Sequence, residues 1–373
     1  MSHPSSRNDH SGTLDLDDFG GVARQLMAEH QIPGLSIAVT SSSGPLYTGA
    51  FGHADLAEHR PTTTDTRFLW FSMSKIVTAT AALRLADEGR LDLDAPVRSV
   101  VPTFAAKAGH AQPRIRQLLN HTAGAANPLP LRWVQPAGGS PGAARDKVQA
   151  LLRRARPTRP VGELARYSNL GYLVLADVIA TVAGEPFEMY VQRGVLEPAG
   201  MRGTGYVHDP TADSATGYAR LPRPLTPLAR LALPPGIVGD RHGCQLALCP
   251  FTVVGAGYGG LIGDAPDAAR LLRIHLADGI IDGTRILAAD TARSMRDVRT
   301  PGKPFDFGLG WFRRPADHDA RPAFVEHWGT GGGFWNAMRI YPELDLGIVV
   351  MANTTRSYRH DVLMRAAVAA FAR

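Results

Sequence analysis

Lysine and cysteine are scarce in this chain of 373 residues. Of its 40 basic residues only four are lysines: Lys75, Lys107, Lys147 and Lys303. The net charge of +6 therefore comes from arginine, and the arginines are scattered rather than interleaved with aromatic residues along one stripe. That pattern argues against a nucleic-acid partner. The two cysteines, Cys244 and Cys249, provide no disulfide framework and suit a reducing compartment.

Long apolar runs are also missing. No stretch approaches the roughly 20 apolar residues that a membrane span needs, so no membrane partner is expected. The opening MSHPSSRNDHSG is polar and lacks the basic and apolar segments of a secretory signal. Residues 1–13 are expected to form a disordered tail, and the protein is expected to be cytoplasmic. The oligomeric state is not predicted.

The hydrophobic pattern predicts strands near both ends of the chain. Apolar residues recur at helical spacing over 16–27 and alternate over 35–39, where Ser41–Gly44 predicts a hairpin turn. Near the C-terminus a helix is predicted over 362–371. Four strands are predicted before it: 308–312, 324–328, 336–341 and 347–352. The short links between these strands predict antiparallel pairing.

The middle of the chain has a helical pattern. Six helical segments are predicted there: 114–120, 143–156, 170–183, 186–196, 265–277 and 288–298. We therefore predict an α/β (α+β) fold, with an antiparallel β-sheet from both termini flanked by helices and an inserted mainly helical domain. The sheet domain takes 14–90 and 299–373, and the helical domain takes 91–298. Two stretches, 125–142 and 207–250, are expected to form an irregular rim around the site.

Lys75 stands three residues after Ser72, at the start of a segment that is apolar on nearly all sides up to Gly89. Such a segment predicts a buried helix. Residues three apart share one helix face, with Cβ atoms about 5–6 Å apart. A buried lysine loses its proton readily, so Lys75 could serve as the base that activates the Ser72 hydroxyl. The alternative is that Ser72 only caps the helix and that Lys75 is solvated.

Tyr167-Ser168-Asn169 precedes a second apolar segment and is the only Tyr-x-Asn in the sequence. Beside a cationic lysine, the Tyr167 phenol would have a lowered pKa and could relay protons. The Asn169 amide would offer both a donor and an acceptor to a substrate. The alternative is a loop tyrosine with Asn169 capping the helix.

His327-Trp328-Gly329-Thr330 ends a predicted strand within EHWGTGGGFWNAMRIY. Glycines at 329 and 331–333 would let another segment approach the backbone closely. An edge strand there could pair with an acyl group and offer a backbone N–H to an oxyanion. The alternative is a glycine-rich hairpin turn without a chemical role.

In this order, the three motifs resemble those of the serine β-lactamase and penicillin-binding-protein superfamily. The resemblance is greatest to the branch that groups class C β-lactamases with family VIII esterases and D-aminopeptidases. That branch shows Ser-x-x-Lys, Tyr-x-Asn, and then Lys-Thr-Gly or His-x-Gly. Connecting segments such as IRQLLNHTAG and GYGGLIGDAPDAARLL are similar too, so the resemblance covers about residues 66–355. The fold that it implies agrees with the layout predicted from periodicity.

The resemblance implies a catalytic role for four residues. Ser72 attacks the carbonyl of a small ester or amide and forms an acyl-enzyme, while Lys75 accepts its proton. Tyr167 protonates the leaving group and later activates water. Asn169 orients the substrate and the Lys75 side chain.

The resemblance also implies a substrate-binding strand, with the backbone N–H groups of Ser72 and Thr330 as the oxyanion hole. His327, Trp328 and Gly329 lie in that strand, where β-lactamases carry Lys-Thr-Gly. The lysine of that motif helps to hold the antibiotic carboxylate. A histidine is mostly neutral near pH 7, so anionic substrates lose attraction and neutral esters or amides are favoured.

The sequence thus predicts an esterase-like serine hydrolase that acts on a small ester or amide. The alternatives within this class are a D-aminopeptidase or amidase and a weak β-lactamase. From another class, a penicillin-binding sensor that acylates slowly and does not turn over also stays open. Neither the natural substrate nor the choice between hydrolysis and acyl transfer is predicted.

Other patterns carry less weight. Gly138–Gly142 fits the Gly-x-Ser-x-Gly nucleophile elbow, but its composition predicts a loop. Gly255–Gly260 fits a dinucleotide-binding fingerprint, but the next helix is predicted to begin only at Asp264, which disfavours a nicotinamide enzyme. His121 is expected to be structural. The thirteen histidines show no HExxH or similar spacing, so neither a metal nor another cofactor is expected.

Overall fold

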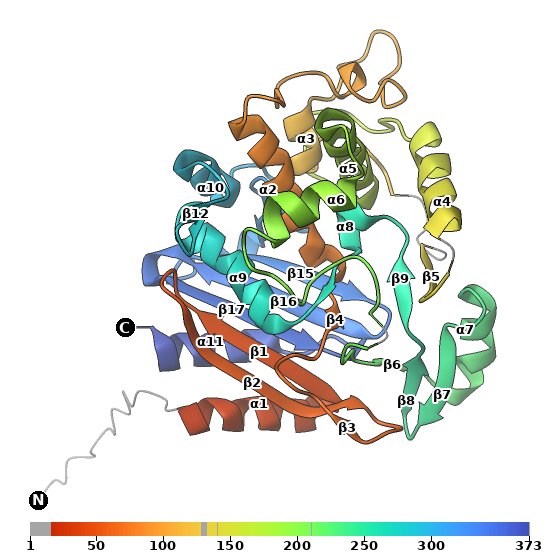
Figure 1. The fold of residues 1–373 in the computed structure, drawn as a ribbon, viewed down its shortest axis with the longest axis vertical. Helices are drawn as coiled ribbons and strands as arrows, with labels where there is room; N and C mark the ends of the chain where they lie inside the picture. Colours follow the sequence, from red (N-terminus) through yellow and green to blue (C-terminus); the bar gives the residue numbers. More distant parts are fainter. Residues whose placement is uncertain (1–15, 128–132, 140, 210, 373) are drawn as a thin grey trace, which may run out of the picture.

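The computed structural model describes residues 16–127, 133–139, 141–209 and 211–372, and the predicted tail over 1–13 lies outside them. An eight-stranded sheet forms its centre, in the order β13-β14-β15-β16-β17-β1-β2-β3 (Figure 1). The strands are β1 (Gly34–Thr40), β2 (Pro45–Asp55), β3 (Arg60–Pro61), β13 (Asp306–Phe307), β14 (Phe312–Arg313), β15 (Val325–Gly331), β16 (Phe334–Tyr341) and β17 (Leu346–Ala352). All pairs are antiparallel, and β1 pairs with β17 from Leu35↔Ala352 onward. The prediction of one antiparallel sheet built from both ends of the chain is confirmed.

Helices cover both faces of this sheet. α1 (Leu16–His30) and α11 (His360–Phe371) lie on one face, and α9 (Ala265–Leu276) lies against β1 and β17 on the other (Figure 1). Successive side chains of a strand point to opposite faces. β17 accordingly divides its side chains between two hydrophobic clusters, with Ile348, Val350 and Ala352 in one and Val349 and Met351 in the other. Burial on both faces explains why β1 and β17 have nearly continuous apolar sequences.

Most of the remaining helices come from the middle of the chain. The remaining helices are α2 (Ser74–Asp87), α3 (Ile115–Leu119), α4 (Pro141–Arg154), α5 (Asn169–Ala183), α6 (Phe187–Val191), α7 (Thr226–Ala232), α8 (Ala256–Gly259), α10 (Ala289–Arg296), the π-helix η3 (Gln192–Leu196) and the 3₁₀ turns η1 (Phe71–Met73), η2 (Val97–Ser99), η4 (Arg223–Leu225), η5 (Pro315–Asp317) and η6 (Pro342–Leu344). α2 packs against α5, α6 and α8, which explains its apolar sequence on all sides. α9 packs on the sheet, although its residues fall within the predicted helical domain, 91–298. The domain boundaries stay a prediction.

Among the described helices, none is by itself long and apolar enough to cross a membrane. The pair formed by Asn169–Ala183 and Phe187–Leu196 passes by length and composition, but it is bent by 77°.

The prediction of an irregular rim over 207–250 is wrong in part. This stretch contains α7 and a three-stranded sheet in the order β6-β8-β7, with β6 at Gly217–Arg220, β7 at Val238–His242 and β8 at Gln245–Leu248. These strands are only four or five residues long, too short for periodicity to reveal them. The other small pairs are β4 (Phe68–Leu69) with β10 (Ile262–Gly263), β5 (Val134–Pro136) with β9 (Phe251–Val253), and β11 (Ile280–Ile281) with β12 (Thr284–Arg285).

Candidate active site

Ser72 lies in the turn η1 that leads into α2. Phe71, just before it, has a φ of +46°, a left-handed value that non-glycine residues rarely adopt and that stores strain. Met73 is the N-cap of α2, and no side chain caps that helix. The alternative in which Ser72 only caps the helix is therefore wrong, and its hydroxyl is available for chemistry.

Lys75 lies in the first turn of α2 and is completely buried. Its Nζ lies 3.1 Å from the Ser72 Oγ and 2.8 Å from the backbone carbonyl oxygen of Tyr258. Burial disfavours the charged form and holds the pKa of Lys75 well below its ordinary value. The alternative of a solvated lysine is wrong, and the side chain can present an uncharged amine to Ser72.

Tyr167 completes the group. The Ser72 hydroxyl lies near enough to its phenol to offset part of the effect of burial on the pKa, and the Lys75 Nζ lies 4.7 Å from the centre of its ring. Burial raises the pKa of Tyr167, so the expectation of a lowered pKa is wrong. The physical reason is that burial takes the phenol out of water, which disfavours its charged form. Tyr167 thus keeps its proton and is suited to donate it.

Asn169 begins α5 and faces the same cavity. The N-cap of α5 is Ser168, whose Oγ accepts a hydrogen bond of 2.8 Å from the Gly171 N–H, so the capping alternative for Asn169 is wrong. The buried Oδ1 of Asn169 has no hydrogen-bond partner within the part of the chain that the structure describes. An unpartnered buried acceptor favours a donor from a bound substrate.

Two residues that the sequence does not single out as catalytic hold the Tyr167–Asn169 segment. The Oδ1 of Asn127 accepts hydrogen bonds from the backbone N–H groups of Asn169 (2.7 Å) and Leu170 (3.2 Å). The Nδ1 of His121 accepts one from the Ser168 N–H at 3.1 Å, and its ring lies 4.8 Å from the Tyr167 ring. Burial holds the pKa of His121 well below its ordinary value, so it acts as a neutral acceptor.

The strand β15 runs past the Ser72 turn. It pairs with β14 only at Phe312↔Glu326, so its edge from His327 onward is free of a strand partner among the described residues. A Cβ added at Gly329 would lie 1.9 Å from the Trp70 carbonyl oxygen, and one at Gly331 would lie 2.1 Å from the Phe71 ring. Glycine is required at both positions for the strand to reach the turn, which confirms the predicted close approach.

His327 and Trp328 point to opposite sides of β15. His327 is completely buried, its ring lies 6.2 Å from that of Tyr167, and burial lowers its pKa to about 3. It is therefore uncharged. Trp328 packs with Phe305 and His360 on the other side, so the structure does not bring its side chain to the cavity.

A cavity of about 350 Å³ opens onto Ser72. Asn169, Thr330 and Ser72 supply its polar lining together with the backbone of β15. The rest is largely apolar: Phe71, Trp133, Val134, Ile237, Leu248, Phe251 and Val253. Small-molecule sites are usually apolar hollows with a few placed polar groups, and this one fits that description.

The contact between Tyr258 and Lys75 was not predicted from the sequence. Tyr258 lies in Gly255–Gly260, which forms the short helix α8 rather than a dinucleotide-binding loop, and its carbonyl holds Lys75. A Cβ at Gly257 would lie 2.6 Å from that of Ala176. The high density of glycine was the available signal, because it marks close packing of α8 against its neighbours. In the other discounted pattern, Ser140 lies outside the described residues.

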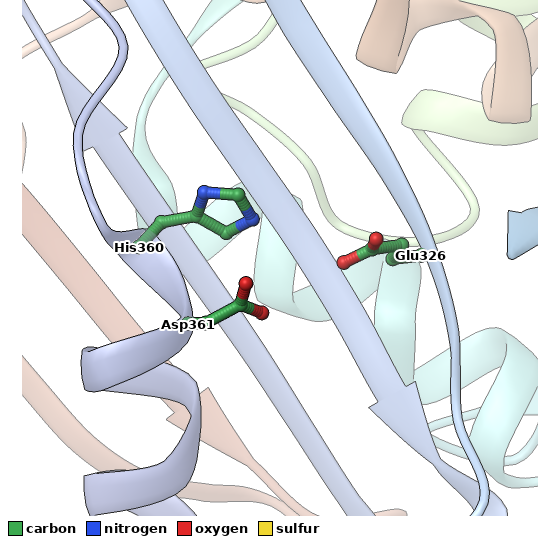
Figure 2. A group of neighbouring side chains, drawn as sticks. All are labelled: Glu326, His360 and Asp361. Atoms are coloured by element: carbon green, nitrogen blue, oxygen red, sulfur yellow. The ribbon is translucent and has the colours of Figure 1, made fainter. Parts of the chain in front are cut away.

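A second cluster of ionisable side chains lies away from Ser72, where Glu326, His360 and Asp361 have possible metal-ligand atoms within 4.8 Å of one another (Figure 2). The Nη2 of Arg339 donates to the Glu326 Oε2 at 2.5 Å and to the Asp361 Oδ1 at 2.6 Å. The guanidinium therefore already occupies the place of a cation between the two carboxylates. We assign the cluster to the stability of the sheet.

The site combines a serine hydroxyl, a buried amine and a phenol beside a free strand edge. Enzymes that form an acyl-serine intermediate use such a combination of groups. The chain matches the family model "Beta-lactamase" over residues 19–373 and belongs to that family. It is a serine hydrolase of the β-lactamase fold.

Three similar proteins show the range of this family. Esterase EstB of Burkholderia gladioli is 30% identical over 364 residues, which cover 89% of this chain and 89% of the relative. The solved structure of "EstCE1, a hydrolase with promiscuous acyltransferase activity" superposes with a TM-score of 0.72 at 26% identity, covering 94% and 97% of the two chains. The class C β-lactamase of Rhodobacter sphaeroides, at 23% identity and a TM-score of 0.68 over 94% and 97%, shares the fold.

Proposed function

We propose that this enzyme cleaves small esters or amides through an acyl-enzyme on Ser72, with carboxylic esters as its main substrates. The observation that carries the proposal is the completely buried amine of Lys75 at 3.1 Å from the Ser72 Oγ. Similarity to an esterase over most of both chains supports the ester part. The uncharged His327 supports it too, since no cation stands at that position to hold the carboxylate of a β-lactam.

Acylation requires three proton transfers among Ser72, Lys75, Tyr167 and the leaving group. The Ser72 oxygen bonds to the carbonyl carbon while its proton passes to the lone pair of Lys75. Backbone N–H groups of Ser72 and Thr330 are the proposed donors to the resulting oxyanion. The carbon–oxygen or carbon–nitrogen bond then breaks, the Tyr167 phenol gives its proton to the leaving group, and the Lys75 ammonium restores the phenol.

Deacylation reverses these roles with water. A water molecule attacks the acyl carbonyl and its proton passes to the Lys75 amine, while Ser72 leaves with a proton from Tyr167. The Lys75 ammonium then gives a proton to Tyr167, which restores both groups. Because its raised pKa keeps the phenol protonated, we assign the activation of water to Lys75, with Tyr167 as the relay.

The same feature of Tyr167 favours one second candidate. If a neutral phenol and an apolar cavity slow the attack of water, the acyl-enzyme persists and the protein acts as a slowly acylating, penicillin-binding sensor. Intact-mass spectrometry after incubation with a β-lactam separates the two functions. A lasting adduct with no burst of ester hydrolysis favours the sensor, and turnover favours the enzyme.

A p-nitrophenyl ester tests the main proposal. We expect a burst of nitrophenol followed by steady turnover, and we expect Ser72→Ala to abolish both. Ser99→Ala is the matched control, since that serine is exposed and bonds only to the Pro96 carbonyl. Equal activity in Ser72→Ala would overturn the assignment of the nucleophile.

We also propose that the enzyme works in the cytoplasm. Cys244 and Cys249 are free thiols, and Cys244 is exposed. Exposed thiols stay reduced in the cytoplasm, and we propose that the enzyme meets its small-molecule substrate there.

A further inference from the structure

A second and larger hollow adjoins the cavity at Ser72. Its volume is about 1020 Å³, and it is formed by β6, η4, α7, β7, β8 and the loop after β17. Leu233, Leu248 and Gly332 line both hollows, so a molecule bound at Ser72 can extend from one into the other. This hollow takes no part in the chemistry proposed above.

Arginine dominates the polar lining of this second hollow. Arg220, Arg223, Arg241 and Arg356 line it, and its lining includes no acidic residue. Within the part of the chain that the structure describes, none of the four forms an ion pair with a carboxylate. Other arginines do form such ion pairs, as Arg116 does with Asp94 and Arg339 with Glu326. A concave surface that carries charge of one sign raises the local concentration of the opposite ion.

The fold fixes the side chain of Arg241 and the loop that carries Arg356. Arg241 donates to the Leu221 carbonyl at 2.8 Å and to the Thr226 Oγ1 at 2.6 Å, which ties β7 to the segment around η4. The loop that carries Arg356 is tied to β6, because the Thr355 N–H donates to the Tyr218 carbonyl at 2.8 Å. The Thr355 Oγ1 also accepts from the Gly333 N–H at 2.6 Å, which joins this loop to the turn beside the Ser72 cavity.

We propose that the substrate carries a carboxylate at some distance from the bond that is cleaved, and that this arginine-lined hollow binds it. The inference rests on the proposed function and names its substrate class: an ester or amide with an apolar part beside the reacting carbonyl and an anionic far end. Guanidinium groups pair with carboxylates through two parallel hydrogen bonds, which fixes orientation as well as charge. His327 provides no positive charge next to the reacting carbonyl, and the arginines of the second hollow provide it at a greater distance from Ser72.

Two series of substrates test the proposal. In the first, p-nitrophenyl monoesters of straight-chain dicarboxylic acids are compared with p-nitrophenyl esters of monocarboxylic acids of equal length. In the second, the butyrate ester of 4-hydroxyphenylacetic acid is compared with that of its amide. We expect kcat/KM to favour the carboxylate by about tenfold or more in one series, as two or more guanidinium contacts would give. No preference in either series overturns the inference.

Variants and salt identify the source of the preference. The ratio of kcat/KM between the paired substrates should fall toward one in Arg220→Gln/Arg356→Gln and should shrink between about 0.05 and 0.5 M salt, where screening shortens to a few ångströms. Arg98→Gln is the control, because this exposed arginine on η2 does not line the hollow. A ratio that survives the double substitution contradicts the site. Loss of Ser72-dependence on the neutral esters would instead contradict the proposed function.

Discussion

The backbone carbonyl of Tyr258 lies 2.8 Å from the Nζ of Lys75 and accepts a hydrogen bond from it. An uncharged amine has two N–H donors and one lone pair. With one donor directed to Tyr258, the lone pair can face the Ser72 hydroxyl at 3.1 Å. The short helix α8 therefore orients the proposed base, although none of its side chains takes part in proton transfer.

Replacement of Lys75 tests whether a removable proton, rather than a positive charge, is needed there. Arginine cannot lose its proton in a protein, so Lys75→Arg should lower kcat/KM for a neutral ester by about a thousandfold, within the range typical for loss of a general base. In the unaltered enzyme kcat/KM should fall as pH drops through the pKa of Lys75, which burial places well below the ordinary lysine value. Stopped-flow assays across pH measure both. Unchanged activity in Lys75→Arg would contradict the role of base.

His327 should not contribute to that pH profile. Burial lowers its pKa to about 3, so it stays uncharged near neutral pH, and the pH profile of kcat/KM in His327→Gln should keep its shape.

Gly329→Ala tests the close approach of β15 to the Ser72 turn. The added methyl group would meet the Trp70 carbonyl oxygen at 1.9 Å, so the strand must move away from Ser72. A displacement of about 1 Å can cost about a hundredfold in rate, and we expect a loss of that order in kcat. Gly21→Ala in α1 is the control, because a Cβ there meets nothing within 4 Å. Normal acylation by Gly329→Ala would show that the strand does not need this contact.

His121 should act as a positioning residue for Tyr167. His121→Leu removes the acceptor for the Ser168 N–H, so we expect kcat to fall about 10- to 100-fold with little change in KM. His121→Asn can still offer a side-chain acceptor and should recover part of the loss. Comparing kcat and KM for the two variants checks this, whereas equal losses in both would indicate a purely packing role.

Arg339 and Glu326 should contribute to stability rather than to catalysis. Arg339→Met leaves the completely buried Glu326 carboxylate without its main partner, which typically costs about 3–5 kcal/mol of the free energy of unfolding. Glu326→Gln/Arg339→Met should lose less than the single variant, because the completely buried charge is gone and only Asp361, which is partly exposed and also contacts Arg314, loses a partner. Urea unfolding measures both.

The exposed pair Arg299–Asp297 provides the comparison. Arg299→Met should change stability by no more than about 1 kcal/mol, since the arginine side chain is 84% exposed. A loss as large as that of Arg339→Met would contradict the importance of burial.

The fold and the proposed nucleophile could be predicted because their signals are local. Apolar runs separated by a short turn mark β16 and β17, the apolar run after Lys75 marks α2, and residues three apart on one helix meet regardless of the rest of the chain. The contacts of Tyr258 and Asn127 could not be predicted, since they join backbone and side chains far apart in sequence. The spacing of apolar residues along the sequence does not reveal such a contact.

The charge states needed more than sequence. The sequence predicted a lowered pKa for Lys75, in the direction that its burial gives, but the pKa of Tyr167 depends on how much water reaches the phenol, which only the packing around it decides. The arginine-lined hollow could not be predicted either, because its four arginines come from three separate segments of the chain, at 220–223, 241 and 356.

The pairing of β1 with β17 has a consequence for how the protein is made. Strand β1 emerges early from the ribosome, while its neighbour at Leu346–Ala352 is translated about three hundred residues later. Until then β1 and β2 form only a hairpin with one edge unsatisfied, a state open to aggregation. Contacts of such long sequence separation slow folding, so productive yield should depend on how well the nascent chain is protected during synthesis.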